Sequence, residues 1–402
     1  MNADIQAVLA GESVGHIICA DWLDGLRELP DGCVHCVVTS PPYWGLRNYN
    51  VAGQLGLEKT PDEYIAKMVA GFREVRRVLR DDGIAFVNLG DSYWNGGAEK
   101  RDGGHGFVDG GKKKLEAAKG ALLQSRSSTS FGLKPKDLCG IPWRVALALQ
   151  ADGWWLRQDI IWAKPNPMPE SVTDRCTKAH EYLFLLTKSP RYYWDAEAVK
   201  EEAKDAESYT GRKFRGPKAT IAAGARPGSQ QTLDKGCPGD GKTFAVVNKR
   251  SVWTIPTSPF SAAHFATFPM KLVEPCVKAG TSDRGCCGAC GKPWKRVVAI
   301  RDPEKRLGKG YHDHEDDLGR GQRGVFPAKG APTRETLGWQ PQCKCGGEPV
   351  ACLCLDPFMG AGTVGLVANN LGRRWLGIEL NPEYIEMALK RIHGPLFAGK
   401  DK

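Results

Sequence analysis

Residues 350–379 read VACLCLDPFMGAGTVGLVANNLGRRWLGIE, and this stretch decides the fold. It opens with a near-continuous apolar run, which is typical of a central parallel strand buried on both faces. The run ends at Asp356, and Gly360 and Gly362 then allow a tight turn to pass close to a ligand without a Cβ collision. A helix and a second apolar strand follow and lead to Glu379. This order predicts half of an α/β sheet.

The same stretch favours a ligand that contains a ribose. Free N–H groups at the start of a helix can meet polar ligand atoms. Glu379 stands about 17 positions after Gly362, at the end of the second strand, where an acidic residue can accept hydrogen bonds from a ribose diol. The third glycine of the dinucleotide fingerprint is missing, which argues against a nicotinamide cofactor. The alternative is a purely structural turn.

A second strand-to-loop junction lies near the other end of the chain. Residues 37–43 read VVTSPPY, so a strand runs directly into Ser40, Pro41, Pro42 and Tyr43. Proline fixes φ and lacks an N–H group, which makes this loop stiff and leaves its carbonyls free to accept hydrogen bonds. Ser40 Oγ and the Pro41 carbonyl could bind the two hydrogens of an exocyclic amino group while Tyr43 stacks on the base. A base in a duplex must be flipped out to reach such a loop. The alternative is a proline-stiffened turn.

The two stretches together resemble the S-adenosylmethionine-dependent DNA amino-methyltransferases. Residues 40–43 are similar to the catalytic motif of that family, and residues 356–362 are similar to its cofactor motif. The catalytic motif comes first, which is the order of the beta group. The resemblance covers most of residues 16–94, 138–195 and 251–392. It implies a Rossmann-like α/β fold: a doubly wound, mostly parallel sheet with permuted motif order and loop-rich insertions.

The resemblance also implies roles for individual residues. S-adenosyl-L-methionine is the implied cofactor, with its methionine part near Gly360 and Gly362 and its ribose hydroxyls on Glu379. Asp21 resembles the acidic residue on the adenine side, and Phe265 lies in a segment, HFATFP, that closes over the methionine. The implied cofactor-binding set is Asp21, Phe265, Asp356, Phe358, Gly360, Gly362, Thr363 and Glu379. The implied catalytic set is Ser40, Pro41, Pro42 and Tyr43.

The Ser-Pro-Pro-Tyr form is associated more with N4-cytosine enzymes, whereas Asp-Pro-Pro-Tyr is more common in N6-adenine enzymes. We therefore expect transfer to N4 of cytosine, with N6 of adenine as the alternative. There are two further alternatives. One is an enzyme that acts on RNA or protein, and the other is an inactive zinc-ribbon nucleic-acid-binding protein with the same fold. The resemblance implies double-stranded DNA as partner. It leaves open whether a restriction enzyme accompanies the protein, and it leaves the oligomeric state open. Residues 164–169 and 180–181 also match close relatives, without an assigned role.

Two closely spaced cysteine pairs predict a structural zinc site. They are Cys287 with Cys290 and Cys343 with Cys345. Four thiolates can close a tetrahedral zinc site, and the polar segment between the pairs has little core of its own. Three other cysteines lie near enough to substitute, but two of them fall in an apolar strand and are interpreted as buried small hydrophobes; the three are Cys286, Cys352 and Cys354.

The formal net charge is +10 and the pI is about 8.9, which favours a polyanionic partner. The N-terminal segment lacks a basic n-region and no apolar run reaches about 20 residues, so we expect a cytoplasmic protein without a membrane partner. The predicted parts are a catalytic half (1–94), a basic insertion (95–135), a middle segment (136–195), a target-recognition region (196–250), a cofactor-closing segment (251–282), a zinc module (283–349) and a cofactor-binding half (350–402).

Overall fold

The structure is a computed structural model that describes residues 2–46, 51, 53–94, 132–202, 246–258, 267–301 and 333–394. The chain divides into two compact units. The first comprises Met1–Asp195, Arg250–Trp294 and Pro341–Lys402, and the second comprises Ala196–Lys249 and Lys295–Gln340. The basic residues that the sequence assigned to target recognition, 212–226, lie outside the described residues, as does most of the 95–135 insertion.

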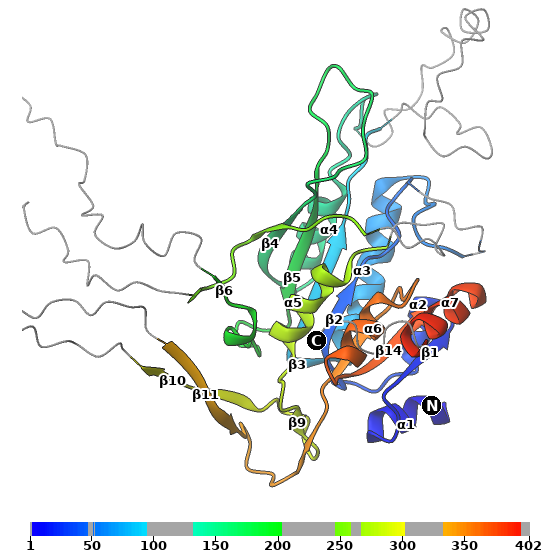
Figure 1. The fold of residues 1–402 in the computed structure, drawn as a ribbon. Helices are drawn as coiled ribbons and strands as arrows, with labels where there is room; N and C mark the ends of the chain where they lie inside the picture. Colours follow the sequence, from blue (N-terminus) through cyan, green and yellow to red (C-terminus); the bar gives the residue numbers. More distant parts are fainter. Residues whose placement is uncertain are drawn as a thin grey trace, which may run out of the picture. The chain divides into compact units, whose positions relative to one another are not determined.

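An eight-stranded sheet forms the centre of the first unit, in the order β1-β14-β13-β2-β3-β5-β4-β8 (Figure 1). Strand β5 runs antiparallel to both of its neighbours, and every other neighbouring pair is parallel. This mostly parallel sheet confirms the predicted fold class. The strands are β1 (Gly15–Cys19), β2 (Val34–Thr39), β3 (Leu79–Leu89), β4 (Trp155–Ala163), β5 (His180–Thr187), β8 (Val252–Thr254), β13 (Leu353–Asp356) and β14 (Arg374–Glu379).

The sheet register brings the two ends of the chain together. In the centre of the sheet β13 pairs in parallel with β2, with Cys354 opposite Cys36 and Leu355 opposite Val37. The carboxyl ends of these parallel strands therefore lie at one edge, which we call the carboxyl edge. The predicted catalytic loop follows β2 and the predicted cofactor loop follows β13, so both loops start at this edge.

Helices cover both faces of the sheet. One core cluster is lined by α1 (Ala3–Ala10), α2 (Trp22–Arg27), α3 (Pro61–Val78) and α4 (Ile141–Ala151), and the other by α5 (Met270–Gly280), α6 (Thr363–Asn370) and α7 (Pro382–His393). Figure 1 shows α5 and α6 along one face. Helix α3 forms because its apolar residues recur at helical spacing and are buried, and because Thr60 Oγ1 accepts from Glu63 N at 3.1 Å.

The sequence alone predicts a turn at Asp81-Asp82-Gly83 and an extension of the sheet as a hairpin at residues 192–194, and both predictions are wrong. Residues 81–83, Asp-Asp-Gly, have the composition of a turn but lie inside β3. The carboxylates are satisfied there, since Asp81 pairs with Lys188 at 2.9 Å and Asp82 with Arg80 at 2.8 Å, and strand pairing overrides the local preference. Residues 192–194 do not extend the sheet as a hairpin. Instead, Tyr193 N donates to Asp82 O at 2.8 Å.

The described part of the second unit contains a short 3-10 helix (Glu197–Val199) and two antiparallel ladders. Strand β6 (Glu201–Glu202) pairs with β7 (Val246–Val247), and β10 (Lys295–Arg301) pairs with β11 (Thr333–Gln340). The sequence placed residues 295–340 in a zinc module, whereas the structure groups them with the 196–249 segment.

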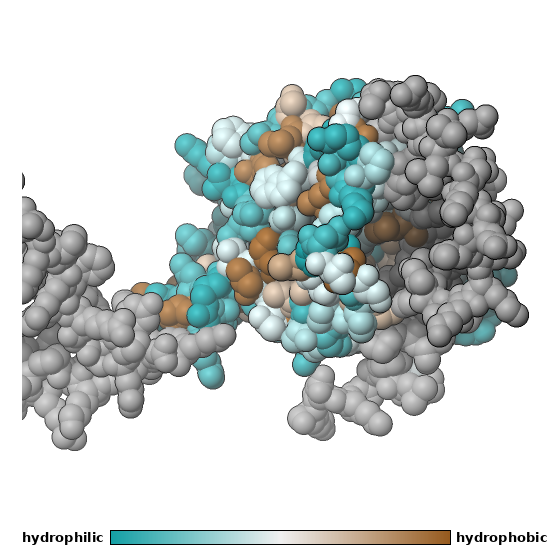
Figure 2. Space-filling view, turned by 90° about the horizontal axis from the view of Figure 1, so that it is seen from above, coloured by the Kyte–Doolittle hydropathy of each residue, from teal (hydrophilic) through white to brown (hydrophobic). Residues whose placement is uncertain are grey.

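The surface of the described residues is mixed in character. Hydrophobic residues on the face seen in Figure 2 lie in small patches among hydrophilic ones. No helix in the described ranges is both long and apolar enough to cross a membrane.

Candidate active site

A buried hydrogen bond joins the predicted catalytic loop to the predicted cofactor loop. Thr39 Oγ1, at the end of β2, donates to Asp356 Oδ1 at 2.7 Å, at the end of β13. The amide of Phe358 donates to the same carboxylate oxygen at 3.0 Å. Thr39 and Asp356 are 0% and 1% exposed, so this contact fixes the two loops to each other.

Asp356 carries an unusual carboxyl group. Burial raises its pKa to about 7, against the opposing effect of the Thr39 hydrogen bond. Its second oxygen, Oδ2, is buried and has no hydrogen-bond partner among the described residues. A buried acceptor of this kind costs free energy unless a ligand or water satisfies it, so it indicates a binding site beside the loop.

The cofactor loop is shaped by its glycines. Gly360 and Gly362 have φ values of 49° and 74°, in the left-handed region that side chains disfavour. A Cβ on Gly362 would also lie 2.8 Å from Ala388 Cβ. Helix α6 then begins at Thr363 without a side-chain cap, which leaves amides of its first turn available.

Glu379 closes this loop from the end of β14. Its Oε2 accepts from Gly360 N at 2.8 Å and its Oε1 accepts from Asn381 N at 2.9 Å. Burial raises the pKa of this carboxyl. Each oxygen retains a lone pair, so the carboxylate can still accept from a diol.

The other residues expected to bind the cofactor have structural contacts of their own. Asp21 caps α2 by accepting from Leu23 N at 2.9 Å, close to the end of β14 because Cys19 pairs with Glu379. Phe358 packs on Trp22, with ring centroids 4.7 Å apart. Thr363 Oγ1 accepts from Arg391 at 2.9 Å. Phe265 lies outside the described residues.

A hydrogen-bond network holds Tyr43 in the catalytic loop. Its hydroxyl donates to Glu181 Oε2 at 2.7 Å and accepts from Asn88 Nδ2 at 2.6 Å. Ser40 Oγ lies 3.3 Å from the same hydroxyl. Asn88 also donates to Glu181 at 2.8 Å, and Lys164 forms an ion pair with the other Glu181 oxygen. The tyrosine is therefore fixed by residues of two strands, Asn88 of β3 and Glu181 of β5.

The sheet topology explains why these partners meet. Asn88 is near the end of β3 and Lys164 directly follows β4, so both lie at the carboxyl edge. Strand β5 runs the other way, so it begins at this edge and places Glu181 there. The sequence marked residues 164–169 and 180–181 without a role. The sequence did not show that β5 runs antiparallel to its neighbours, and this direction is what brings Glu181 to Tyr43.

The prolines and a glycine complete the packing of the loop. Pro41 is buried, and the Pro42 carbonyl accepts from Tyr64 Oη of α3 at 2.9 Å. A Cβ on Gly90 would lie 2.6 Å from Tyr43 Cε2, so the tyrosine ring rests on bare backbone. The arrangement can present oriented acceptors and one aromatic face beside a ligand loop.

Comparisons with known proteins agree with this geometry. A family model described as DNA methylase matches residues 34–287 and 351–390. Type II methyltransferase M.Cfr9I of Citrobacter freundii is 38% identical over 374 residues, 93% of this chain and 86% of that protein. This chain belongs to the DNA methylase family. Type II methyltransferase M.SmaI of Serratia marcescens is 37% identical over 376 residues, 94% of this chain and 90% of that protein.

The fold of this DNA methyltransferase is also found among solved structures. PvuII DNA methyltransferase (cytosine-N4-specific) superposes with a TM-score of 0.50 and 17% identity, covering 94% of this chain and 86% of that chain. At this identity the likeness concerns the fold. The mostly parallel sheet with helices on both faces is thus an architecture shared with that protein.

The methyltransferase also carries the predicted cysteine cluster. The sulfurs of the four predicted cysteines all lie within 4.8 Å of one another. Tetrahedral zinc–sulfur bonds of about 2.3 Å require sulfurs roughly 3.8 Å apart, so the set fits such a site. Backbone hydrogen bonds from Cys290 and Ala289 lower the pKa of Cys287 to about 7, which favours its thiolate. The neighbouring thiols of Cys290 and Cys343 raise the pKa of Cys345 to about 12.

A second group of metal-ligand type contains His35, Cys286 and Cys352. His35 Nδ1 accepts from Leu353 N at 3.1 Å, and its Nε2 lies 2.8 Å from Gly291 O. Both ring nitrogens are therefore hydrogen-bonded to backbone groups. The imidazole links the segment after Cys290 to strand β13 and has a structural role.

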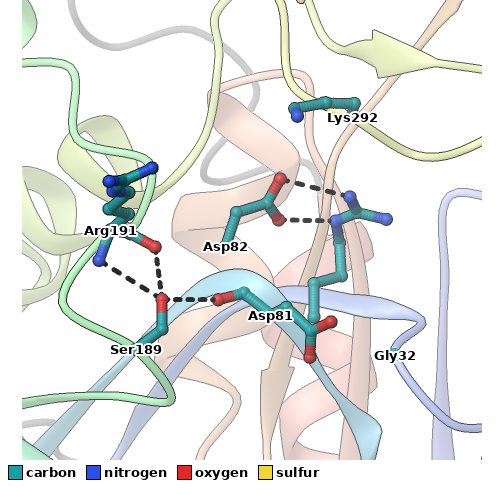
Figure 3. Close-up of a pocket in the computed structure, with 7 residues that line it drawn as sticks. Gly32, Asp81, Asp82, Ser189, Arg191 and Lys292 are labelled. Atoms are coloured by element: carbon teal, nitrogen blue, oxygen red, sulfur yellow. Dashed lines mark hydrogen bonds and ion pairs between the residues drawn. The ribbon is translucent and has the colours of Figure 1, made fainter. Parts of the chain in front are cut away.

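The methyltransferase has a pocket of about 390 Å³ away from the active site. Figure 3 shows it lined by Asp81, Asp82, Ser189, Arg191 and Lys292, and Arg80 also lines it. The aspartates and Arg80 lie near the start of β3, and Ser189 and Arg191 follow the end of β5, at the edge of the sheet opposite the carboxyl edge. Lys292 belongs to the segment that follows Cys290. Arg80 is held by Asp82, so the pocket is electrostatically mixed and plays no part in the catalytic geometry.

Proposed function

We propose that this DNA methyltransferase transfers a methyl group from S-adenosylmethionine to N4 of a flipped cytosine in double-stranded DNA. The observation that carries the proposal is the Thr39–Asp356 hydrogen bond of 2.7 Å. It holds a glycine-rich ligand loop against a loop of oriented acceptors at the carboxyl edge of one sheet. Such alignment of two reactants can supply a large part of the rate enhancement.

The residues of the ligand loop suit S-adenosylmethionine. Glu379 offers carboxylate lone pairs to the ribose hydroxyls, and the open turn at Gly360 and Gly362 admits the methionine part. The orphaned Asp356 Oδ2 and the uncapped start of α6 offer an acceptor and donors for polar cofactor atoms. When bound, the cofactor supplies an electrophilic methyl group on a sulfonium.

The acceptors of the catalytic loop prepare the amino group of the base. That nitrogen is a poor nucleophile because its lone pair is delocalised into the ring. Ser40 Oγ and the Pro41 carbonyl would accept hydrogen bonds from its two N–H groups and so favour a localised lone pair. As the bond from nitrogen to the methyl carbon forms, the methyl–sulfur bond would break to leave a neutral thioether, and the nitrogen would release one of its protons to solvent. Tyr43 would stack on the flipped base, and Asn88 and Glu181, which hold its hydroxyl, act as positioning residues.

The choice of cytosine rests on Ser40, which stands where many adenine enzymes of the family have aspartate. Mass spectrometry of nucleosides from DNA of cells that express the protein tests it. We expect N4-methylcytosine, absent from cells that express a Ser40→Ala, Tyr43→Ala double variant. N6-methyladenine would overturn the base assignment, and an absence of both nucleosides would overturn the proposed activity.

Gly90→Ala tests the positioning of Tyr43. The added Cβ would meet the tyrosine ring at 2.6 Å and displace it, since the clash is with a ring held at its hydroxyl. We expect the single-turnover rate on duplex DNA to fall on the order of 10- to 100-fold. Cofactor affinity, measured by calorimetry, should remain at the wild-type value because Gly90 is not part of the ligand loop. A wild-type rate would show that the ring position is not needed.

We further propose that the four-cysteine cluster binds one structural zinc ion. The supporting observation is that all four sulfurs lie within 4.8 Å of one another, outside the catalytic and cofactor loops. The metal would tie residues before the β10–β11 ladder to residues after it, where the chain offers little apolar core.

Elemental analysis of the purified protein should find about one zinc per chain. Cys290→Ser should remove the metal and lower the melting temperature, whereas Cys176→Ser, an exposed cysteine outside the cluster, should change neither. Metal-free wild-type protein that melts at the same temperature after zinc addition would refute the site.

A further inference from the structure

The segment between the two cysteine pairs forms a two-stranded ribbon. Strands β10 and β11 pair antiparallel from Lys295 opposite Gln340 to Arg301 opposite Thr333. In the sequence the cysteine pairs flank this ribbon, because Cys290 precedes it by about five residues and Cys343 follows it by about three. Beside the cysteines, Gln342 Nε2 donates to Pro293 O at 2.9 Å.

The described side chains of the ribbon include large apolar groups that are exposed. Ile300 and Leu337 are 57% and 61% exposed, and Val297 is 38% exposed. A two-stranded ribbon is marginally stable in water unless its surface is covered. Exposed apolar side chains at these positions are available for contact with a partner.

The ribbon is also basic. Its two strands contain Lys295, Arg296, Arg301 and Arg334 against one acidic residue, Glu335, which gives four positive charges less one, or a net charge of +3. Arg334 is paired with Glu197 at 2.6 Å, which leaves a net charge of +2 for a polyanion. This positive charge complements a polyanion. It is a poorer match for a protein surface that is apolar or has few acidic residues.

One arginine of the ribbon is held in a fixed pose. The Arg296 guanidinium lies 4.3 Å from the centroid of the Trp339 ring, and its Nη1 donates to Thr336 Oγ1 at 3.2 Å. Stacking on an aromatic ring orients the planar guanidinium, which then loses less entropy when it binds a phosphate or a guanine edge. The pose fits recognition better than simple solvation.

We infer that the β10–β11 ribbon contacts DNA, lying in the major groove of the duplex. The inference rests on the proposed function, because it takes duplex DNA as the substrate. The major groove admits a two-stranded β-ribbon, and apolar side chains can contact thymine methyl groups there. A strand of seven residues spans roughly 23 Å, which matches about two thirds of a helical turn of B-DNA.

A matched pair of variants tests the ribbon. The ribbon variant carries Lys295→Ser, Ile300→Ser and Leu337→Ser, all exposed positions whose loss removes no core packing. The control carries Lys390→Ser, Val14→Ser and Leu147→Ser, exposed positions of the first unit. The probe is a fluorescent 40-bp duplex that contains a site found methylated in cells expressing the wild-type protein.

We expect the dissociation constant for this duplex to rise on the order of 10- to 100-fold in the ribbon variant and to stay within about twofold in the control. Cofactor affinity and the single-turnover rate at saturating DNA should match the wild type in both. Lys295→Gln alone should lower the slope of log K against log salt by about one. Unchanged duplex affinity in the ribbon variant, with an unchanged salt slope for Lys295→Gln, would overturn the inference. Failure of the proposed function would show instead as wild-type protein that methylates no base.

Discussion

Replacement of Ser40 by alanine should lower the rate of methyl transfer about a hundredfold in single turnover, roughly 2.7 kcal/mol, while cofactor affinity stays nearly unchanged. The reason is the loss of one oriented acceptor for the amino hydrogens. The structure makes the variant specific, because Tyr43 keeps its bonds to Glu181 at 2.7 Å and to Asn88 at 2.6 Å without Ser40. The aromatic face of the site is therefore left in place.

The matched control is Ser189→Ala. This serine lies after β5 at the opposite edge of the sheet, where its hydroxyl contacts backbone carbonyls. We expect wild-type turnover from it. The measurement is a rapid-quench assay with labelled cofactor and excess enzyme. A Ser40→Ala rate equal to that of Ser189→Ala would remove Ser40 from the mechanism.

Glu379→Gln should weaken S-adenosylmethionine binding by on the order of 1.5–3 kcal/mol, which is about 10- to 150-fold in the dissociation constant. The amide retains the shape of the carboxylate but has one acceptor oxygen and no charge. It must also satisfy the Gly360 amide, which now donates to Glu379 Oε2 at 2.8 Å. We expect both the hydrogen bond to the Gly360 amide and the hydrogen bonds to the ribose to be weakened.

Calorimetry with the free enzyme measures this effect directly. Glu383→Gln serves as the control, since Glu383 is an exposed residue in the first turn of α7 and takes no part in the loop. Equal affinity in the two variants would show that the ribose is held elsewhere. Because Asp356 shares the loop, circular dichroism of Glu379→Gln should confirm that the sheet is intact.

Much of the fold could be predicted because its central strands are apolar runs that end abruptly at a polar residue followed by proline. The runs before Ser40 and Asp356 have this form, and the alternation of strands and helices predicted the parallel sheet. The family resemblance added the order of the motifs. The identity of the family is confirmed by the match over residues 34–287 and 351–390.

Other features depend on pairing that a local pattern does not show. The turn-like residues 81–83 lie in a strand because Arg80 and Lys188 satisfy their carboxylates. Glu181 reaches Tyr43 because β5 runs antiparallel, and strand direction is a property of the whole sheet. The ribbon between the cysteine pairs was read as polar loop, since its apolar residues are few and face outward.

The Thr39–Asp356 contact also means that the candidate active site can form only late in the synthesis of the chain. The two residues are 317 positions apart, and β13 is inserted between β2 and β14 in the middle of the sheet. During synthesis, β2 and β3 can pair long before β13 leaves the ribosome, and the far edge of β2 stays unpaired in the meantime. A chain interrupted before residue 356 would therefore have the predicted catalytic loop without the predicted cofactor loop. It would also expose the unpaired edge of the apolar strand β2, which can aggregate with other chains.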